Sequence, residues 1–438
     1  MISATILEAL ARRERESDII VSAGGRHVSA RALRALIGEC AGAAPPGRAR
    51  WVNEDDPVLF IAQCLACRQD GVPAIIGTPC MLRTLWPGAE HELPEDVAFV
   101  LHTSGSTGQT VGVMTTERSF VENVRDMLPY VQPGHVERWF VCSPLSTSYG
   151  MSLGLWLPLF VGGTIHPVAY SNARACLSEL GQEPRSAVVA TPTVYRSWLE
   201  WPGLLAEVAR VEPTLFASGE PLPAELAERY AGLGLRLLDC YGSTETNGIA
   251  VCDAPGSGVF TPLGSVQVRL EPGEAGAPGG TLLVQSPKIM RGYRGAAALS
   301  KMRVRDGWVD TGDWVEPVGS GRFRIVGRSS SLIKVAGQRV HPEQVERELE
   351  ALPEVAEALV CADADERRGE SLVAYVKPRA AANIDADQLR AMLTQRLPRY
   401  MVPRRIVFVE ALEHVSQKKV RRVPAAAAAP APRASRES

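Results

Sequence analysis

Long apolar runs are missing from this 438-residue sequence. No stretch approaches the roughly 20 consecutive apolar residues that a membrane-spanning helix needs. The first residues, MISATILEALARRERESD, also lack the apolar centre of a secretory signal peptide. The sequence therefore predicts a protein without a membrane span.

Paired cysteines at zinc-binding spacing are missing as well, since the nine cysteines are scattered. Cys64 and Cys67 form a single CLAC pair inside an apolar, helix-like run. Buried thiols are the simpler interpretation, and a metal or redox role is the alternative. Scattered thiols fit a reducing environment, so we expect a cytoplasmic location.

The strongly positive charge typical of bulk nucleic-acid binding is absent, because the formal net charge is −2. The charges are distributed unevenly along the chain, however, with eight basic and two acidic residues between Arg396 and Arg422. A solvated face is the ordinary explanation of such a cluster. A docking patch for an acidic partner is the alternative.

Strand-like apolar runs alternate with helix-like stretches through most of the chain, as in DPVLFIAQCLACRQDG followed by VPAIIG. Such alternation indicates an α/β fold with parallel sheets. From about 260 to 325, short β-type runs separated by Gly and Pro predict a small β-barrel or meander. We therefore expect a large N-terminal domain of layered α/β subdomains plus a small β-barrel.

Three consecutive serines, Ser329 to Ser331, form a flexible-looking joint. The unit that follows has a helix-like segment, a hairpin-like stretch and a second helix-like segment, which predicts a mobile α+β domain. The last residues, PAAAAAPAPRASRES, have nothing to bury and are expected to be disordered. The predicted boundaries are 1–328 for the N-terminal core, 260–328 for its β-barrel-like part, 329–423 for the C-terminal domain and 424–438 for the tail.

The stretch from His102 to Val113, HTSGSTGQTVGV, follows an apolar strand-like run. Hydroxyl and backbone N–H donors in such a loop can converge on phosphate oxygens, and glycines permit close approach. No Gly-Lys-Ser/Thr follows, so the loop is not of the Walker A type, and a plain turn is the alternative. The candidate phosphate-binding residues are Thr103, Ser104, Gly105, Ser106, Thr107 and Gly108.

A second stretch, LLDCYGSTETNG from Leu237 to Gly248, predicts a strand that ends at Thr244 and Glu245. A Glu beside a Thr at a strand end can reach a magnesium ion and a phosphoryl oxygen together. Three further motifs follow in order: GWVDTGD with a nearby Gly-Arg pair, LIKVAGQRVHPEQVE and EHVSQKKVRR.

In this order and spacing, the motifs resemble the adenylate-forming superfamily of acyl-CoA synthetases, nonribosomal peptide synthetase adenylation domains and luciferases. The resemblance covers nearly the whole chain. It implies a ligase that uses ATP and Mg²⁺ to form an acyl-adenylate and then a thioester. That chemistry brings two anions together, so it needs positioning, a metal ion and a lysine charge.

The resemblance also implies roles for single residues. The loop at Thr103–Gly108 would hold the β- and γ-phosphates of ATP. Lys419 would bridge the carboxylate and the α-phosphate, Thr244 would contact the α-phosphate and Glu245 would bind Mg²⁺. Two residues, Asp313 and Arg328, would hold the ribose. The residues expected to frame the adenine or complete the ATP site are Gly219, Glu220, Pro221, Asp239, Cys240, Tyr241, Gly242 and Ser243.

Three departures from the family pattern stand out. Thr110-Val111-Gly112 replaces the usual Pro-Lys-Gly, so one phosphate-facing lysine is missing and pyrophosphate should be held less tightly. Ser330 occupies the hinge position, where Asp or Lys is usual. Gln417-Lys418-Lys419 replaces Ser-Gly-Lys, which makes Lys418 the alternative to Lys419. A non-catalytic nucleotide-binding homologue is therefore the alternative function, against which the retained Glu245, Asp313 and Lys419 argue.

The stretch PLSTSYG at 144–150 has a Ser and a Thr where many fatty and coumaroyl-type ligases have an aromatic residue and a histidine. A pocket edged with hydroxyls and an amide suits a small acid with its own hydroxyl, such as a hydroxybenzoate of an aryl-polyene-type pigment pathway. No Asp that could hold an α-amine lies between Ser143 and Gly154. Structural packing is the alternative, above all for Tyr149. The expected substrate-binding residues are Ser146, Thr147, Tyr149, Ser218, Cys240 and Asn247.

The acceptor is expected to be a thiol, either of CoA or of a carrier protein. No Ser-centred phosphopantetheine motif follows the C-terminal unit, so a carrier would act in trans. The basic cluster could meet an acidic carrier helix or the phosphates of CoA. We favour the acyl carrier protein, with CoA as the alternative. The resemblance places Gly337 in the tunnel through which the pantetheine thiol reaches the adenylate.

Overall fold

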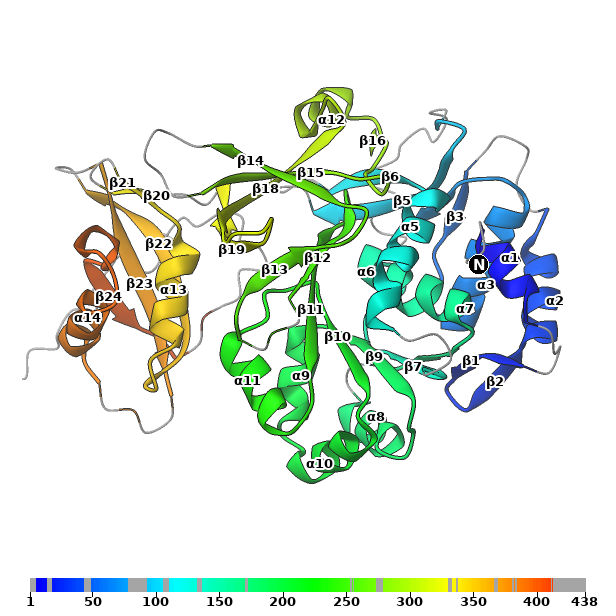
Figure 1. Cartoon of the computed structure of the whole chain (residues 1–438), viewed down its shortest axis with the longest axis horizontal. Helices are drawn as coiled ribbons and strands as arrows, with labels where there is room; N and C mark the ends of the chain where they lie inside the picture. The colour runs from blue at the N-terminus through cyan, green and yellow to red at the C-terminus, as the bar shows by residue number, and fades with distance from the viewer. Residues whose placement is uncertain are drawn as a thin grey trace, which may run out of the picture.

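The computed structural model describes most of the chain, as a large α/β body and a smaller C-terminal unit (Figure 1). The described residues are 5–13, 18–42, 49–77, 93–104, 110–131, 136–169, 172–252, 254, 256–272, 279–329, 333–335, 338–365, 369–379, 382, 384–410 and 412.

The main sheet of the large body runs in the order β14-β15-β18-β19-β13-β12-β11-β10-β9-β7-β8-β1-β2, and β17 pairs with β18. Its segment from β11 to β1 is parallel, and the remaining pairs are antiparallel. Its strands are β1 (Ile19–Ala23), β2 (Arg26–Ser29), β7 (Arg138–Val141), β8 (Thr164–Pro167), β9 (Ser186–Ala190), β10 (Thr214–Ala217), β11 (Leu237–Ser243), β12 (Asn247–Cys252), β13 (Val259–Pro262), β14 (Gln267–Pro272), β15 (Gly280–Gln285), β17 (Val304–Arg305), β18 (Trp308–Pro317) and β19 (Phe323–Arg328).

A second sheet in the order β16-β6-β5-β4-β3 lies above strands β7 and β9 of the main sheet in Figure 1. Helices between the two sheets contact both, since α5 packs against β5, β6 and β12, and η2 packs against β7. The elements of this layer are β3 (Arg50–Val52), β4 (Ala74–Ile76), β5 (Val97–Ser104), β6 (Thr110–Thr116), β16 (Gly292–Tyr293), α1 (Ile6–Ala11), α2 (Ala30–Cys40), α3 (Pro57–Gln69), α5 (Glu117–Met127), η1 (Leu128–Tyr130), α6 (Ser148–Met151), η2 (Ser152–Trp156), α7 (Leu157–Val161) and α12 (Ala297–Arg303).

The parallel strands are covered on both faces, which explains their nearly continuous apolar sequences. In β9, Ala187 and Val189 point into the core between the sheets, whereas Val188 and Ala190 point into a second core. This alternation follows from the two-residue repeat of a strand. The second core is closed by α8 (Ala173–Leu180), α9 (Pro192–Trp198), α10 (Pro202–Val211) and α11 (Ala224–Gly232), at the bottom of Figure 1.

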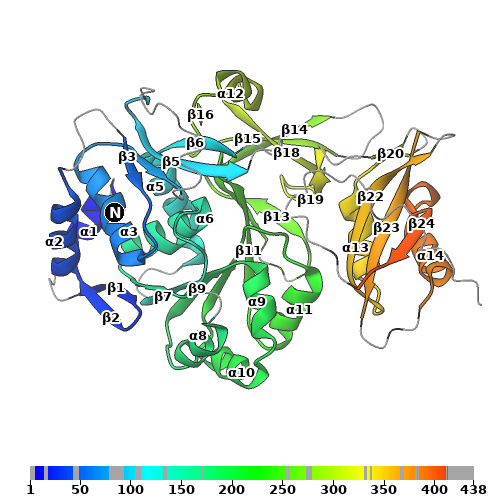
Figure 2. The same ribbon diagram turned by 180° about the vertical axis from the view of Figure 1, so that it is seen from behind.

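The C-terminal unit has a core of its own and lies at the end of the molecule beside β19, as both views show (Figures 1 and 2). The guanidinium of Arg347 joins the two parts by donating to the Val326 carbonyl at 3.0 Å. Its elements are β20 (Ile333–Val335), β21 (Gln338–Val340), α13 (Pro342–Glu350), β22 (Val355–Asp365), β23 (Gly369–Pro378), α14 (Ala386–Thr394), η5 (Arg399–Met401) and β24 (Arg405–Phe408).

The predicted fold class is confirmed, with a large sheet-containing N-terminal part and a smaller α+β unit. The β-rich segment expected from about 260 is present as antiparallel strands, and it joins the main sheet through β13. The exact domain boundaries stay a prediction. Ser330 and the tail lie outside the described residues. Among the described residues, no helix is long and apolar enough to cross a membrane.

The CLAC pair lies on α3, where Cys64 and Cys67 are 1% and 0% exposed. Burial raises the pKa of the Cys67 thiol to about 11, which keeps it protonated. The interpretation as buried thiols is confirmed.

Candidate active site

A cavity of about 520 Å³ opens between the hairpin β11–β12, helix α5, the segment 147–153 and strand β18. This volume is in the usual range for a small-molecule site. Predicted residues from distant parts of the sequence meet in its wall: Thr103, Thr147, Tyr149, Ser218, Gly219, Cys240, Tyr241, Gly242, Ser243, Thr244, Glu245, Asn247 and Arg328.

The hairpin β11–β12 places Glu245 in the turn at 244–246 between the two strands. The Glu245 carbonyl accepts from the Met290 N–H at 2.7 Å, and its carboxylate Oε1 accepts from the Tyr293 hydroxyl at 3.0 Å. Both the backbone and the side chain of this glutamate are therefore fixed by the segment at 290–293.

Asn247 begins β12 in the left-handed region, with φ 58°, a conformation that Asn tolerates better than most residues. Its side chain is buried, with Oδ1 accepting from Ser152 Oγ at 3.0 Å. Ser152 accepts in turn from Asn123 Nδ2 at 2.8 Å, and Asn123 Oδ1 accepts from the Gly248 N–H at 3.0 Å. A closed polar network thus joins α5, η2 and the hairpin on one side of the cavity.

Gly248 is required for this network, because a Cβ there would lie 2.6 Å from Asn123 Oδ1. The sequence did not single out Asn123 or Ser152. Ser152 lies in a π-helical turn, a local irregularity frequent at functional sites, which a motif comparison does not detect.

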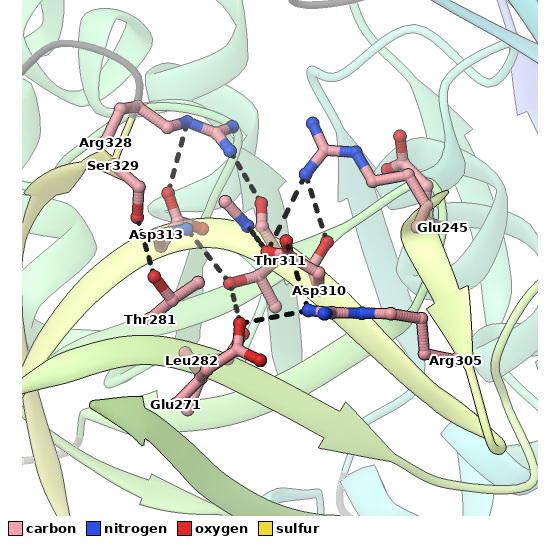
Figure 3. Close-up of polar contacts among 12 residues, drawn as sticks. Glu245, Glu271, Thr281, Leu282, Arg305, Asp310, Thr311, Asp313, Arg328 and Ser329 are labelled. Atoms are coloured by element: carbon pink, nitrogen blue, oxygen red, sulfur yellow. Dashed lines mark hydrogen bonds and ion pairs between the residues drawn. The ribbon is translucent and has the colours of Figure 1, made fainter. Parts of the chain in front are cut away.

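Asp313 lies behind the opposite wall, where its two carboxylate oxygens have different partners. The Tyr241 hydroxyl donates to Oδ2 at 2.5 Å, and Arg328 Nε lies 3.1 Å from Oδ1. Burial raises the pKa of Asp313, and the Arg328 guanidinium opposes that shift. Arg328 also donates to the Thr311 carbonyl at 2.9 Å, as Figure 3 shows. The predicted ribose pair is therefore held together beside the cavity.

Several hydroxyls in the cavity wall already donate to backbone carbonyls. The Tyr149 hydroxyl donates to the Phe216 carbonyl at 2.8 Å, and Ser218 Oγ donates to the Cys240 carbonyl at 2.5 Å. Thr147 Oγ1 accepts from the Gly150 N–H at 3.0 Å as the N-cap of α6. These contacts support the packing interpretation of Tyr149, although its side chain also lines the cavity.

Other predicted residues lie outside the cavity lining. Ser146 and Pro221 are exposed, and Glu220 accepts from Thr193 Oγ1 at 2.6 Å. Asp239 lies on β11, directly before Cys240 in the sequence. The predicted residues Gly105, Ser106, Thr107, Gly108, Ser330, Gly337, Lys418 and Lys419 lie outside the described residues, as does the Ser104 side chain.

Asp239 gives a pH-dependent prediction, because burial raises its pKa from 3.8 to about 7. The folded chain holds this proton in a pH range where the unfolded chain has lost it, so stability falls as pH rises through that range. The Asp239→Asn variant has no carboxylate that must become charged inside the folded protein as the pH rises. We expect the melting temperature of the variant, relative to wild type, to increase from pH 5 to pH 8. The exposed Asp55→Asn is the control, and an equal offset at every pH would contradict the expectation.

The residues present fit a magnesium ion that is held mainly by substrate. Mg²⁺ is commonly bound by one or two carboxylates together with phosphate oxygens. Glu245 offers one carboxylate in the cavity beside Thr244. No cluster of three or more His, Cys, Asp or Glu suited to a metal occurs in the part of the chain that the structure describes. Glu245 and Thr244 would hold such an ion together with the nucleotide.

Comparison with known proteins decides the family. The model of the AMP-binding enzyme family matches residues 19–294, and that of the AMP-binding enzyme C-terminal domain matches 344–419. The chain belongs to the AMP-binding enzyme family. The resemblance to the adenylate-forming superfamily is thereby confirmed, and the chain is an AMP-forming acid–thiol ligase.

The relatives of this AMP-binding enzyme differ in the acid and in the thiol acceptor that their names give. A feruloyl-CoA synthase of an Amycolatopsis species is 32% identical over 336 residues, which are 74% of this chain and 68% of the relative. An L-proline–[L-prolyl-carrier protein] ligase of Pseudomonas fluorescens is 30% identical, over 75% of this chain and 68% of the relative.

The fold also matches solved structures. The o-succinylbenzoate CoA synthetase of Bacillus subtilis, in complex with its acyl-adenylate, superposes with a TM-score of 0.78 at 21% identity, over 94% of this chain and 96% of that one. At this identity, the similarity supports the fold of this AMP-binding enzyme and says nothing of its substrate.

Proposed function

We propose that the chain activates a small aryl acid as its adenylate and transfers the acyl group to the thiol of CoA. The supporting observation is the distribution of charge in the cavity. Among the described residues that line it, the charged ones are Glu245, Arg303, Asp310 and Arg328. All four lie at the hairpin turn or on α12, β18 and β19, and none of them is on α5 or η2.

That wall combines a polar edge with an apolar one. Asn123, Ser152 and Asn247 form the polar edge, while Met127 and Leu263 are among the apolar residues. An uncharged ring with a polar substituent suits such a wall, because it can fill apolar space and still meet hydrogen-bonding groups. A free ammonium group would find no carboxylate among the described residues of this wall. The name of the feruloyl-CoA synthase relative supports an aryl acid.

The choice of acceptor differs from the one that the sequence favoured. The feruloyl-CoA synthase relative supports CoA. An acyl carrier protein is the second candidate, because the L-prolyl-carrier ligase relative and the basic cluster between Arg396 and Arg422 both favour it. Within this cluster, Arg404 and Arg405 are exposed, as a docking surface requires.

The proposal is tested in two steps. ATP–pyrophosphate exchange is first measured with hydroxybenzoic, cinnamic, amino and alkyl acids, and we expect the aryl acids to give the highest kcat/KM. Thioester formation is then measured with CoA and with an acidic holo-carrier protein, at low and high salt, and we expect efficient use of CoA.

The Arg404→Glu/Arg405→Glu variant separates the acceptors. Exposed charges act over roughly 8–10 Å at physiological salt, so an extended carrier surface should respond to the reversal at low salt and less at high salt. CoA makes fewer contacts and should tolerate it. A salt-sensitive increase in KM for the carrier, together with poor use of CoA, would favour the second candidate. Nucleotide binding without exchange for any acid would favour a non-catalytic homologue.

A further inference from the structure

We infer that Arg303 binds the pyrophosphate part of ATP, at the end of the cavity where the phosphate loop presents the uncharged Val111. This inference rests on the proposed use of ATP to activate an acid. Arg303 is the last residue of α12, and both Arg303 and Val111 line the cavity.

Contacts with the β18 segment fix the Arg303 guanidinium. Its Nη1 donates to the Asp310 carbonyl at 3.2 Å and lies 3.8 Å from the Asp310 carboxylate. Beneath it is Gly312, where a Cβ would lie only 3.0 Å from the same nitrogen. These contacts with β18 involve Nη1, and the guanidinium also interacts with the Tyr293 phenol, so part of its five N–H donors is left for an anion. The side chain is 23% exposed and lines the cavity.

Val111 shares an apolar cluster with the helix that carries this arginine. It is opposite Thr103 in the β5–β6 register, at the base of the phosphate loop. It packs in one apolar cluster with Leu299 and Val304, which lie on either side of Arg303 along the chain. The uncharged position of the loop and the helix of Arg303 are therefore linked by one apolar cluster, and both residues line the same cavity.

The electrostatic surroundings of Arg303 match a site for magnesium and phosphate. The Tyr293 hydroxyl donates to Glu245 Oε1 at 3.0 Å, and Tyr293 lies on β16, against which α12 packs. Arg303 therefore lies close to the residue that holds the candidate metal ligand. Arg328, by contrast, is paired with Asp313 on the ribose side. The two arginines of the cavity thus serve different parts of the nucleotide.

Arg305 provides a matched control. It is only two residues from Arg303 and lies 4.0 Å from the Asp310 carboxylate. It pairs with Glu271 at 2.9 Å, is 48% exposed and does not line the cavity, and Figure 3 shows it on the Glu271 side of Asp310. Loss of its charge should change the general electrostatics of this surface without removing a phosphate contact.

The experiment compares wild type, Arg303→Gln, Arg303→Lys and Arg305→Gln by calorimetric binding of Mg·ATP, Mg·pyrophosphate and AMP. Hydrogen bonds to charged groups are worth about 1.5–3 kcal/mol, or roughly 10- to 150-fold. We expect Arg303→Gln to weaken ATP and pyrophosphate binding at least about tenfold and to leave AMP binding unchanged. Arg303→Lys should retain part of the affinity, and Arg305→Gln all of it.

A second-site variant tests the neighbourhood directly. Val111→Lys in the Arg303→Gln background should restore pyrophosphate affinity, because the new ammonium group would enter the same end of the cavity. Unchanged pyrophosphate affinity in Arg303→Gln would overturn the inference, and so would an equal loss for AMP, which would indicate a structural role. Failure of the proposed function appears separately, as a wild type that binds no ATP or exchanges no pyrophosphate.

Discussion

Replacement of Glu245 by glutamine is expected to reduce magnesium-dependent adenylation by about 100-fold or more, the usual scale for loss of a group that stabilises transition-state charge. The substitution keeps the shape of the side chain and removes its negative charge. The glutamine oxygen can still accept from the Tyr293 hydroxyl, which contacts Oε1 at 3.0 Å. The fold should therefore survive while the metal loses its carboxylate. The measurement is ATP–pyrophosphate exchange as a function of Mg²⁺ concentration.

Glu271→Gln is the control for this experiment, because Glu271 is 46% exposed, pairs with Arg305 and does not line the cavity. Its exchange rate should match wild type. We expect Glu245→Gln to retain a melting temperature close to that of wild type. Near-normal exchange in Glu245→Gln at limiting Mg²⁺ would remove this residue from the metal site.

Replacement of Lys419 by alanine is expected to reduce adenylation by a comparable or larger factor. The superfamily uses a lysine at the matching position to join the carboxylate and the α-phosphate, and a positive charge between two anions stabilises the transition state directly. The second half-reaction starts from the finished adenylate and does not need that charge. Thioester formation from chemically supplied acyl-adenylate should therefore continue at close to the wild-type rate.

Lys418→Ala is the matched control, since it removes the same charge one position away. It should keep most of the exchange activity. If Lys418→Ala is inactive and Lys419→Ala is active, the catalytic lysine has been placed one residue too late. Loss of both half-reactions in Lys419→Ala would instead indicate damage to the C-terminal unit.

Much of the fold could be predicted because its determinants are local. The apolar runs that become β5 and β9 are continuous in sequence, and strands buried on both faces need that continuity. The place of Thr244 and Glu245 at the end of β11 was also predictable, because they follow a strand directly in the sequence. Local patterns thus identified the elements and the residues at their ends.

Contacts between distant segments could not be predicted in the same way. Asn123 and Asn247 are 124 positions apart in the sequence, and only packing of α5 against β12 brings their network together. Arg303 belongs to none of the sequence motifs. Its guanidinium is held by a hydrogen bond to the Asp310 carbonyl on β18, a contact that no local pattern indicates. Hydroxyls such as that of Ser218 were expected to face the acid, whereas the structure shows that it donates to a backbone carbonyl. A sequence pattern gives the type of a polar group but not its partner.

The short turn between Glu245 and Asn247 has a consequence for changes of specificity. The proposed metal ligand, Glu245, and the proposed acid-binding residue, Asn247, are separated by a single residue, Thr246, which is buried. We therefore expect a displacement of Asn247 to move the Glu245 carboxylate as well, so a variant selected for a new acid at this position should also lose affinity for nucleotide. Met127 and Leu263 line the same pocket without belonging to the hairpin turn. They offer positions where substrate preference can diverge independently of ATP use.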